Sequence, residues 1–223
     1  MRVSYSIACQ YLAASELFIR EAILLESNFN NSLIPEEQVR IAEIKHKGLI
    51  SAVIMQCCAA LESSIYQVVH DGPGWHKGSN GINLDQKNYL NKFKDLIDKT
   101  QGVVERFKVV LDLLKLEPLD LGKNPNQSVI ILVALRNELV HFKPVAVIPF
   151  DDEKLLKKLK SLNLNESPFP GAKSIFFPNA CLSADCGKWS LESTVNFLNS
   201  FYLKLNAGNP IEHYKEMCDT IAG

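Results

Sequence analysis

The sequence predicts an all-α protein that forms a single domain over residues 1–223. Apolar residues recur at helical spacing through most of the chain. Hydrophobic residues make up 47% of the chain and the formal net charge is −1, which is typical of a compact globular protein and not of a disordered one. There is no alternation of strand and helix patterns and no Gly-rich phosphate loop, so a dinucleotide-binding fold is excluded.

The first two helices are expected at residues 3–26 and from Glu36 to His70. An Asn-rich turn over residues 28–32 separates them, and Pro35 followed by two acidic residues is typical of a helix start. The second span of about 35 residues would be some 50 Å long at 1.5 Å per residue. We therefore expect a break or bend near Gly48.

Three helices follow in the central part of the chain. Residues 85–100 and 103–116 have amphipathic patterns, and a third, strongly apolar helix begins after the sequence Asn124-Pro125-Asn126. Pro144 disfavours helical geometry at the residue before it, so this third helix should end at residue 141 or 142.

The pattern changes after Pro144, and we expect residues 145–223 to pack on a core formed by about residues 1–144. A short amphipathic helix carries Leu155, Leu156 and Leu159 on one face. Prolines and glycines in residues 163–188 predict an irregular loop, with a short hairpin through residues 174–177 as an option. Helices over residues 189–206 and 211–221 complete the chain.

A polar cluster ends the apolar central helix. After eight uncharged residues, the sequence continues Arg136-Asn137-Glu138-Leu139-Val140-His141. At about 100° per residue, Asn137 and His141 share a helix face, and the long Arg136 side chain can reach the same side. A fixed cation, an amide and a side chain that titrates near neutral pH are suited to phosphate contact and proton transfer. A surface Arg beside a helix-capping His is the alternative.

This pattern, Arg136-Asn137-x-x-x-His141, resembles the signature of the HEPN superfamily. Residues 52–66 also resemble the small-residue-rich helix that precedes the motif helix in those proteins. The resemblance implies a HEPN-like up-and-down bundle with extra helices and the irregular region near residues 163–188. It further implies a metal-independent endoribonuclease without cofactors, in which 2′-hydroxyl attack cleaves RNA at a site shared across a homodimer.

The same resemblance assigns roles to individual residues. Arg136 would hold the scissile phosphate, His141 would act as general acid or base, and Asn137 would orient either one. Glu62 would orient the motif Arg or Asn, although a Glu on the wet side of its helix is the alternative reading. The resemblance also suggests a toxin or defence protein, with an antitoxin or a nucleotidyltransferase as candidate cognate partner.

Several lysines are candidates for contacts with RNA phosphates. Because the net charge is close to zero, an RNA site must be local. Lys143 follows the motif, and Lys154, Lys157 and Lys158 lie on the polar side of the next expected helix. The alternative is an ordinary solvated helix face.

The six cysteines predict a cytoplasmic protein with reduced thiols. Only Cys181 and Cys186 are close enough in sequence to suggest a clip, and no second pair lies at a zinc-ligand interval. The apolar stretch from Leu49 to Leu61 is too short to span a bilayer, so no membrane is expected. The rival to the nuclease is a non-catalytic helical dimerisation or interaction module, in which Arg136 and His141 are structural.

Overall fold

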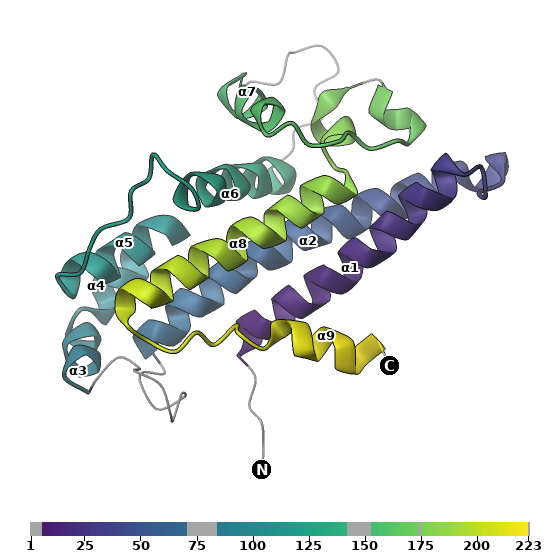
Figure 1. Cartoon of the computed structure of the whole chain (residues 1–223). Coiled ribbons are helices and arrows are strands. Elements are labelled where there is room, and N and C mark those ends of the chain that lie inside the picture. The colour runs from purple at the N-terminus through teal and green to yellow at the C-terminus, as the bar shows by residue number, and fades with distance from the viewer. Residues whose placement is uncertain (1–5, 71–83, 142–152, 174, 223) are drawn as a thin grey trace.

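The computed structural model describes residues 6–70, 84–141, 153–173 and 175–222, and the structural statements below concern these ranges. Within them every regular element is helical and no strand occurs, which confirms the all-α prediction (Figure 1). The elements in chain order are α1 (Ile7–Asn30), α2 (Glu36–His70), α3 (Leu84–Lys92), α4 (Lys94–Lys99), α5 (Val103–Leu113), α6 (Asn126–Val140), α7 (Glu153–Ser161), the short turns η2 (Pro170–Lys173) and η3 (Phe176–Ala180), α8 (Ala184–Leu205) and α9 (Tyr214–Ala222).

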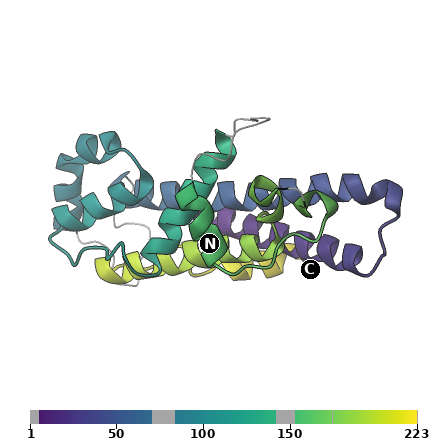
Figure 2. The same cartoon turned by 90° about the horizontal axis from the view of Figure 1, so that it is seen from above.

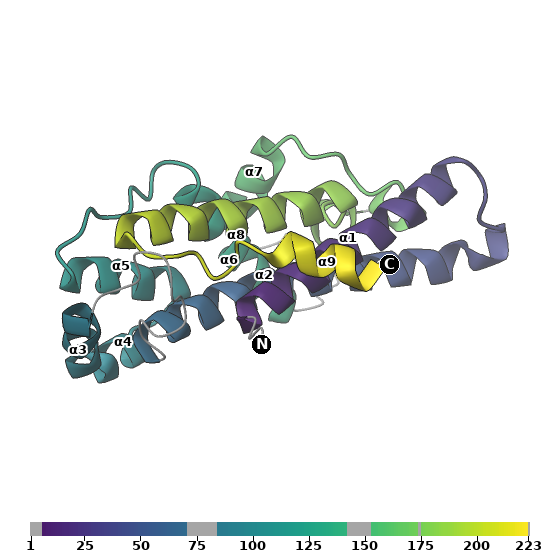
Figure 3. The same ribbon diagram turned by 60° about the horizontal axis from the view of Figure 1, so that its bottom comes forward.

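Three long helices, α1, α2 and α8, pack side by side and form the centre of the molecule (Figure 1). The remaining helices cover this layer, with α6 on α2 and α8, and α9 along α1 (Figure 3). Seen from above, the α1–α2 turn forms one end of the molecule and α3 to α5 form the other (Figure 2). One cluster of buried apolar residues runs through all these layers, from Ala8 in α1 to Cys218 in α9.

The first two helices form a long antiparallel hairpin. The Ser6 hydroxyl accepts the Ala8 N–H at 3.2 Å and caps α1 at its start. The helix then continues to Asn30, past its predicted end at residue 26 and into the predicted turn, and closes where the Leu33 N–H donates to the Asn28 carbonyl at 2.8 Å. The second helix begins at Glu36 and ends at His70 as predicted. It is continuous through Gly48, so the helix does not break there.

By length and composition alone, α2 is long and apolar enough to cross a membrane. Half of its most apolar 18-residue window is buried within the protein. Because α2 packs against α1, α5, α6 and α8, its position in the core accounts for that composition.

The start of α8 differs from the prediction, because the helix begins at Ala184 and not near residue 189. Ser183 caps it by accepting the Cys186 N–H at 3.2 Å. Gly187 favours a loop in the sequence, but in the structure it lies inside α8, where this helix closely approaches α1 and α2. A Cβ atom there would come within 3.1 Å of Ile50 Cδ1 and 3.2 Å of Ile19 Cγ1, so this glycine lets α8 approach α1 and α2.

Two other predicted elements are wrong. The single helix expected over residues 85–100 is split at Phe93, whose φ and ψ of −109° and 12° leave the helical region and whose carbonyl starts α4. The hairpin considered at residues 174–177 is absent from the part of it that the structure describes. The carbonyl of Ile175 instead accepts the Ala180 N–H at 3.2 Å, which closes the turn η3.

A polar contact fixes the junction of α1, α2 and α8. Glu26 Oε1 lies 2.8 Å from His46 Nε2 and accepts the Ala184 N–H at the start of α8, also at 2.8 Å. His46 is fully buried and its ring packs on that of Phe169, with centroids 5.0 Å apart. One carboxylate therefore satisfies groups from two other helices.

Candidate functional site

The motif helix α6 places its polar residues on the side away from the core. Its buried face carries Val129, Leu132 and Leu135. The positions after Leu135 face away from the core, so Arg136 is half-buried while Asn137 and His141 are exposed. The helix ends at Val140 and His141 forms its C-cap, as Pro144 predicts.

Arg136 is held by two oxygen acceptors. Its Nη2 donates to Glu62 Oε1 at 2.6 Å, and its Nη1 donates to Asn137 Oδ1 at 3.1 Å. Glu62 lies on α2, so this ion pair joins the motif helix to the central hairpin. The structure therefore brings together three residues that the sequence selected from separate segments.

The ion pair is open to solvent on one side. The Arg136 side chain is 29% exposed and that of Glu62 is 47% exposed, so the pair contributes no more than about 1 kcal/mol to folding. A guanidinium has five N–H donors; Glu62 and Asn137 take two of them, and a hydrogen bond with the Cys58 side chain takes another. Arg136 thus keeps donors for an external anion.

The side chain of Cys58 contacts the Arg136 guanidinium, and the sequence did not predict this contact. Cys58 is one helical turn before Glu62 on α2 and is buried. Burial raises the pKa of its thiol to about 12, and the charge of the nearby Arg136 opposes that rise. The spacing of four residues before Glu62 is the sequence signal that could have revealed this contact.

His141 is exposed at the end of α6, one turn beyond Asn137. Its backbone N–H donates to the Asn137 carbonyl at 2.9 Å. No hydrogen bond or ion pair of its imidazole is found in the described part of the chain. As far as the described residues go, the exposed imidazole is free to contact a ligand or a second copy of the chain.

The predicted RNA-binding lysines do not join this cluster. Lys143 lies outside the described residues. Lys154, Lys157 and Lys158 are exposed on α7, which packs on α6 through the buried Leu155 and Leu159. None of the described contacts of Arg136 or Asn137 is with these lysines.

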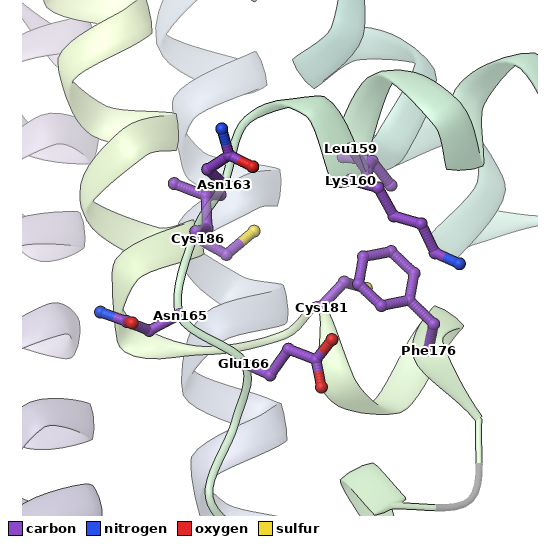
Figure 4. Close-up of a pocket in the computed structure, with 9 residues that line it drawn as sticks. Leu159, Lys160, Asn163, Asn165, Glu166, Phe176, Cys181 and Cys186 are labelled. Carbon is purple, nitrogen blue, oxygen red and sulfur yellow. The ribbon is translucent and has the colours of Figure 1, made fainter.

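A cavity of about 500 Å³ lies elsewhere, between α7, the extended segment after it and the start of α8 (Figure 4). Lys160 and Glu166 lie at its rim, and Cys181 and Cys186 are among its lining residues. All six cysteines of the chain are buried and form no disulfide, so Cys181 and Cys186 are not linked to each other. None of Arg136, Asn137 and His141 lines this cavity.

No group of three or more His, Cys, Asp or Glu side chains in the described ranges is arranged to hold a metal ion. Comparison with known proteins assigns no family: no family model, no curated protein and no solved structure matches the chain. The function must be inferred from the residues around Arg136 and from their geometry.

Proposed function

We propose that the protein is a metal-independent endoribonuclease of HEPN type, with a HEPN-like bundle as its fold. The observation that carries this proposal is the arrangement at the end of α6. Arg136 is bound by Glu62 and Asn137 while its side chain stays 29% exposed, and the exposed His141, whose imidazole has no partner among the described residues, lies one turn beyond Asn137. A phosphate-binding group and a proton-transfer group are thus exposed at the end of the same helix.

In the proposed reaction, the 2′-oxygen of a ribose attacks the adjacent phosphorus and the bond from phosphorus to the 5′-oxygen breaks. His141 accepts the proton of the 2′-hydroxyl or donates a proton to the leaving 5′-oxygen. Arg136 contacts the non-bridging oxygens, where negative charge develops. The products are a 2′,3′-cyclic phosphate and a 5′-hydroxyl, and amino-acid side chains suffice for each step.

A site of this kind needs two proton-transfer groups, whereas each chain offers one at the motif. We therefore propose a closed two-fold dimer in which His141 of the partner subunit supplies the second group. Val140, an apolar residue that is 52% exposed between Asn137 and His141, suits such an interface. The resemblance to the HEPN superfamily alone adds that the protein is a cytoplasmic toxin or defence protein with an antitoxin or nucleotidyltransferase partner.

The test is cleavage of single-stranded RNA by purified protein in excess EDTA, with the product ends identified. We expect 2′,3′-cyclic phosphate ends, and a loss of about a hundredfold or more in rate for His141→Ala, as is typical for removal of a general acid or base. His213→Ala is the matched control, because His213 is also exposed but lies next to α9. Equal cleavage by the parent and by His141→Ala would refute the assignment.

Light scattering tests the shared site independently. The chain mass is 25.0 kDa, and a species of twice that mass is expected at tens of micromolar protein. A monomer at that concentration would contradict a site built from two copies, even if the RNA assay were positive.

One observation favours a second candidate, the non-catalytic interaction module. The charge of Arg136 is already paired with Glu62 inside the single chain. In that case His141→Ala and Arg136→Ala would leave RNA untouched, as would the parent, while dimerisation or partner binding would depend on exposed residues of α6. The EDTA assay and light scattering together distinguish the two candidates.

A further inference from the structure

A stacked aromatic pair, in which Tyr66 is exposed and His70 is mostly buried, lies on the same face of α2 as Glu62. Tyr66 follows Glu62 by four residues and His70 follows Tyr66 by four, so the three side chains form one stripe along the helix. Tyr66 is 59% exposed, and its ring stacks on that of His70 with centroids 3.8 Å apart and planes 16° from parallel.

The His70 ring of this pair is held in place by an acidic residue. His70 Nε2 lies 3.2 Å from Asp98 Oδ1 on α4, so the end of α2 and the α3–α4 segment hold the imidazole in place. His70 covers one face of the Tyr66 ring, and the exposure of Tyr66 leaves its other face accessible. Such a ring is a flat, pre-oriented surface for another π system.

The stripe starts at the proposed phosphate site. Glu62 accepts a hydrogen bond from Arg136, and Tyr66 lies about 6 Å farther along the α2 axis at 1.5 Å per residue. Unpaired nucleobases stack on Tyr and His rings, whereas phosphates bind Arg. An Arg and an open aromatic face one helical turn apart fit the phosphate and the base of a single-stranded nucleic acid.

We propose that Tyr66, supported by His70, is a stacking subsite for an unpaired base of the RNA whose phosphate binds at Arg136. This inference rests on the proposed function, because it assigns the neighbouring part of the same substrate. Stacking uses the face of the base and not its hydrogen-bonding edge, so the subsite accepts all four bases and selects single strands over duplexes.

The test measures binding without cleavage. The probe is a short single-stranded RNA with 2′-O-methyl riboses, which removes the nucleophile, and one 2-aminopurine, whose fluorescence falls on stacking. We expect Tyr66→Leu to weaken binding about 5- to 100-fold and to remove the quenching, while Tyr66→Phe retains both. Tyr89→Leu is the matched control, since Tyr89 is exposed on α3 and packs on Phe93 instead.

Salt dependence separates the two subsites. Arg136→Ala should lower the slope of log K against log salt by roughly one unit, because it removes a phosphate contact, whereas Tyr66→Leu should weaken binding at an unchanged slope. An unchanged affinity in Tyr66→Leu overturns the stacking subsite, whether or not the parent cleaves RNA. Binding that depends on Tyr66 in a protein without nuclease activity would support the subsite and refute the proposed function. A parent protein that does not bind the probe overturns both.

Discussion

Raising the pH from 9 to 10 should destabilise the fold through its buried thiols. Burial raises the pKa of Cys57, Cys58 and Cys186 to about 12 each. In the unfolded chain these thiols ionise near pH 8.5 to 9, so there the unfolded state binds fewer protons than the native state. Stability is therefore retained below about pH 9 and is lost as the pH rises toward 12.

The expected loss follows from the number of thiols. Each contributes about 1.4 kcal/mol per pH unit once the unfolded thiol is ionised, so three thiols together remove about 4 kcal/mol between pH 9 and 10. That is a large part of the roughly 5–15 kcal/mol by which a domain is stable.

Urea unfolding followed by circular dichroism at pH 8, 9 and 10 measures this loss. Alanine at Cys57, Cys58 and Cys186 lowers stability at every pH but should remove about half of the slope between pH 9 and 10, because burial also raises the pKa values of the Cys9, Cys181 and Cys218 thiols. Each single variant should lower the slope by about 1.4 kcal/mol per pH unit, which keeps the test available if the triple variant does not fold. A slope below about 1 kcal/mol per pH unit, or one that the substitutions leave unchanged, would refute the argument from burial.

Three further predictions concern stability and use the same unfolding assay. Phe107→Ala should cost about 3–5 kcal/mol, because Phe107 is fully buried against two aromatic rings of α8, and Phe107→Leu should cost much less. Glu26→Ala should cost about 2–3 kcal/mol, because it leaves the buried His46 and the Ala184 N–H at the start of α8 without their acceptor. The control Glu16→Ala breaks an exposed ion pair with Arg20 and should cost under about 1 kcal/mol. Arg136→Ala should change the free energy of unfolding by no more than about 1 kcal/mol, so a larger loss would mean that the residue is structural.

The ends of the motif helix and of the central hairpin could be predicted from sequence because local chemistry determines them. Pro144 ends α6 near His141, and Pro35 with two acids starts α2. These effects act over a few residues and do not depend on what packs against the helix.

Other helix boundaries depend on tertiary contacts, and the predictions made from sequence were wrong there. Gly187 reads as a helix breaker, but it is needed where α8 touches Ile19 and Ile50. Residues 85–100 have one amphipathic pattern, yet Phe93 leaves the helical region and separates α3 from α4. In both cases the preference of the local sequence is weaker than the constraint from packing.

The candidate site was predictable in part. Arg136, Asn137 and His141 are adjacent in sequence, so one helix places them together, and Glu62 was selected as a carboxylate that needs a partner. The exposed Tyr66 ring, which stacks on His70, was not predicted, because a mostly apolar helix suggests burial on all sides. Which side of α2 remains open is decided by the positions of α6 and α8 and not by its own residues.

The central claim is that Arg136 and His141 act on the same step of RNA cleavage. Single-turnover rates in EDTA for the parent, Arg136→Ala, His141→Ala and the double variant test it most directly. If the two residues form one site, each single variant loses about a hundredfold or more, and the double variant is less than about tenfold slower than the slower single variant. Losses that multiply in the double variant, or single variants as fast as the parent, would contradict the claim.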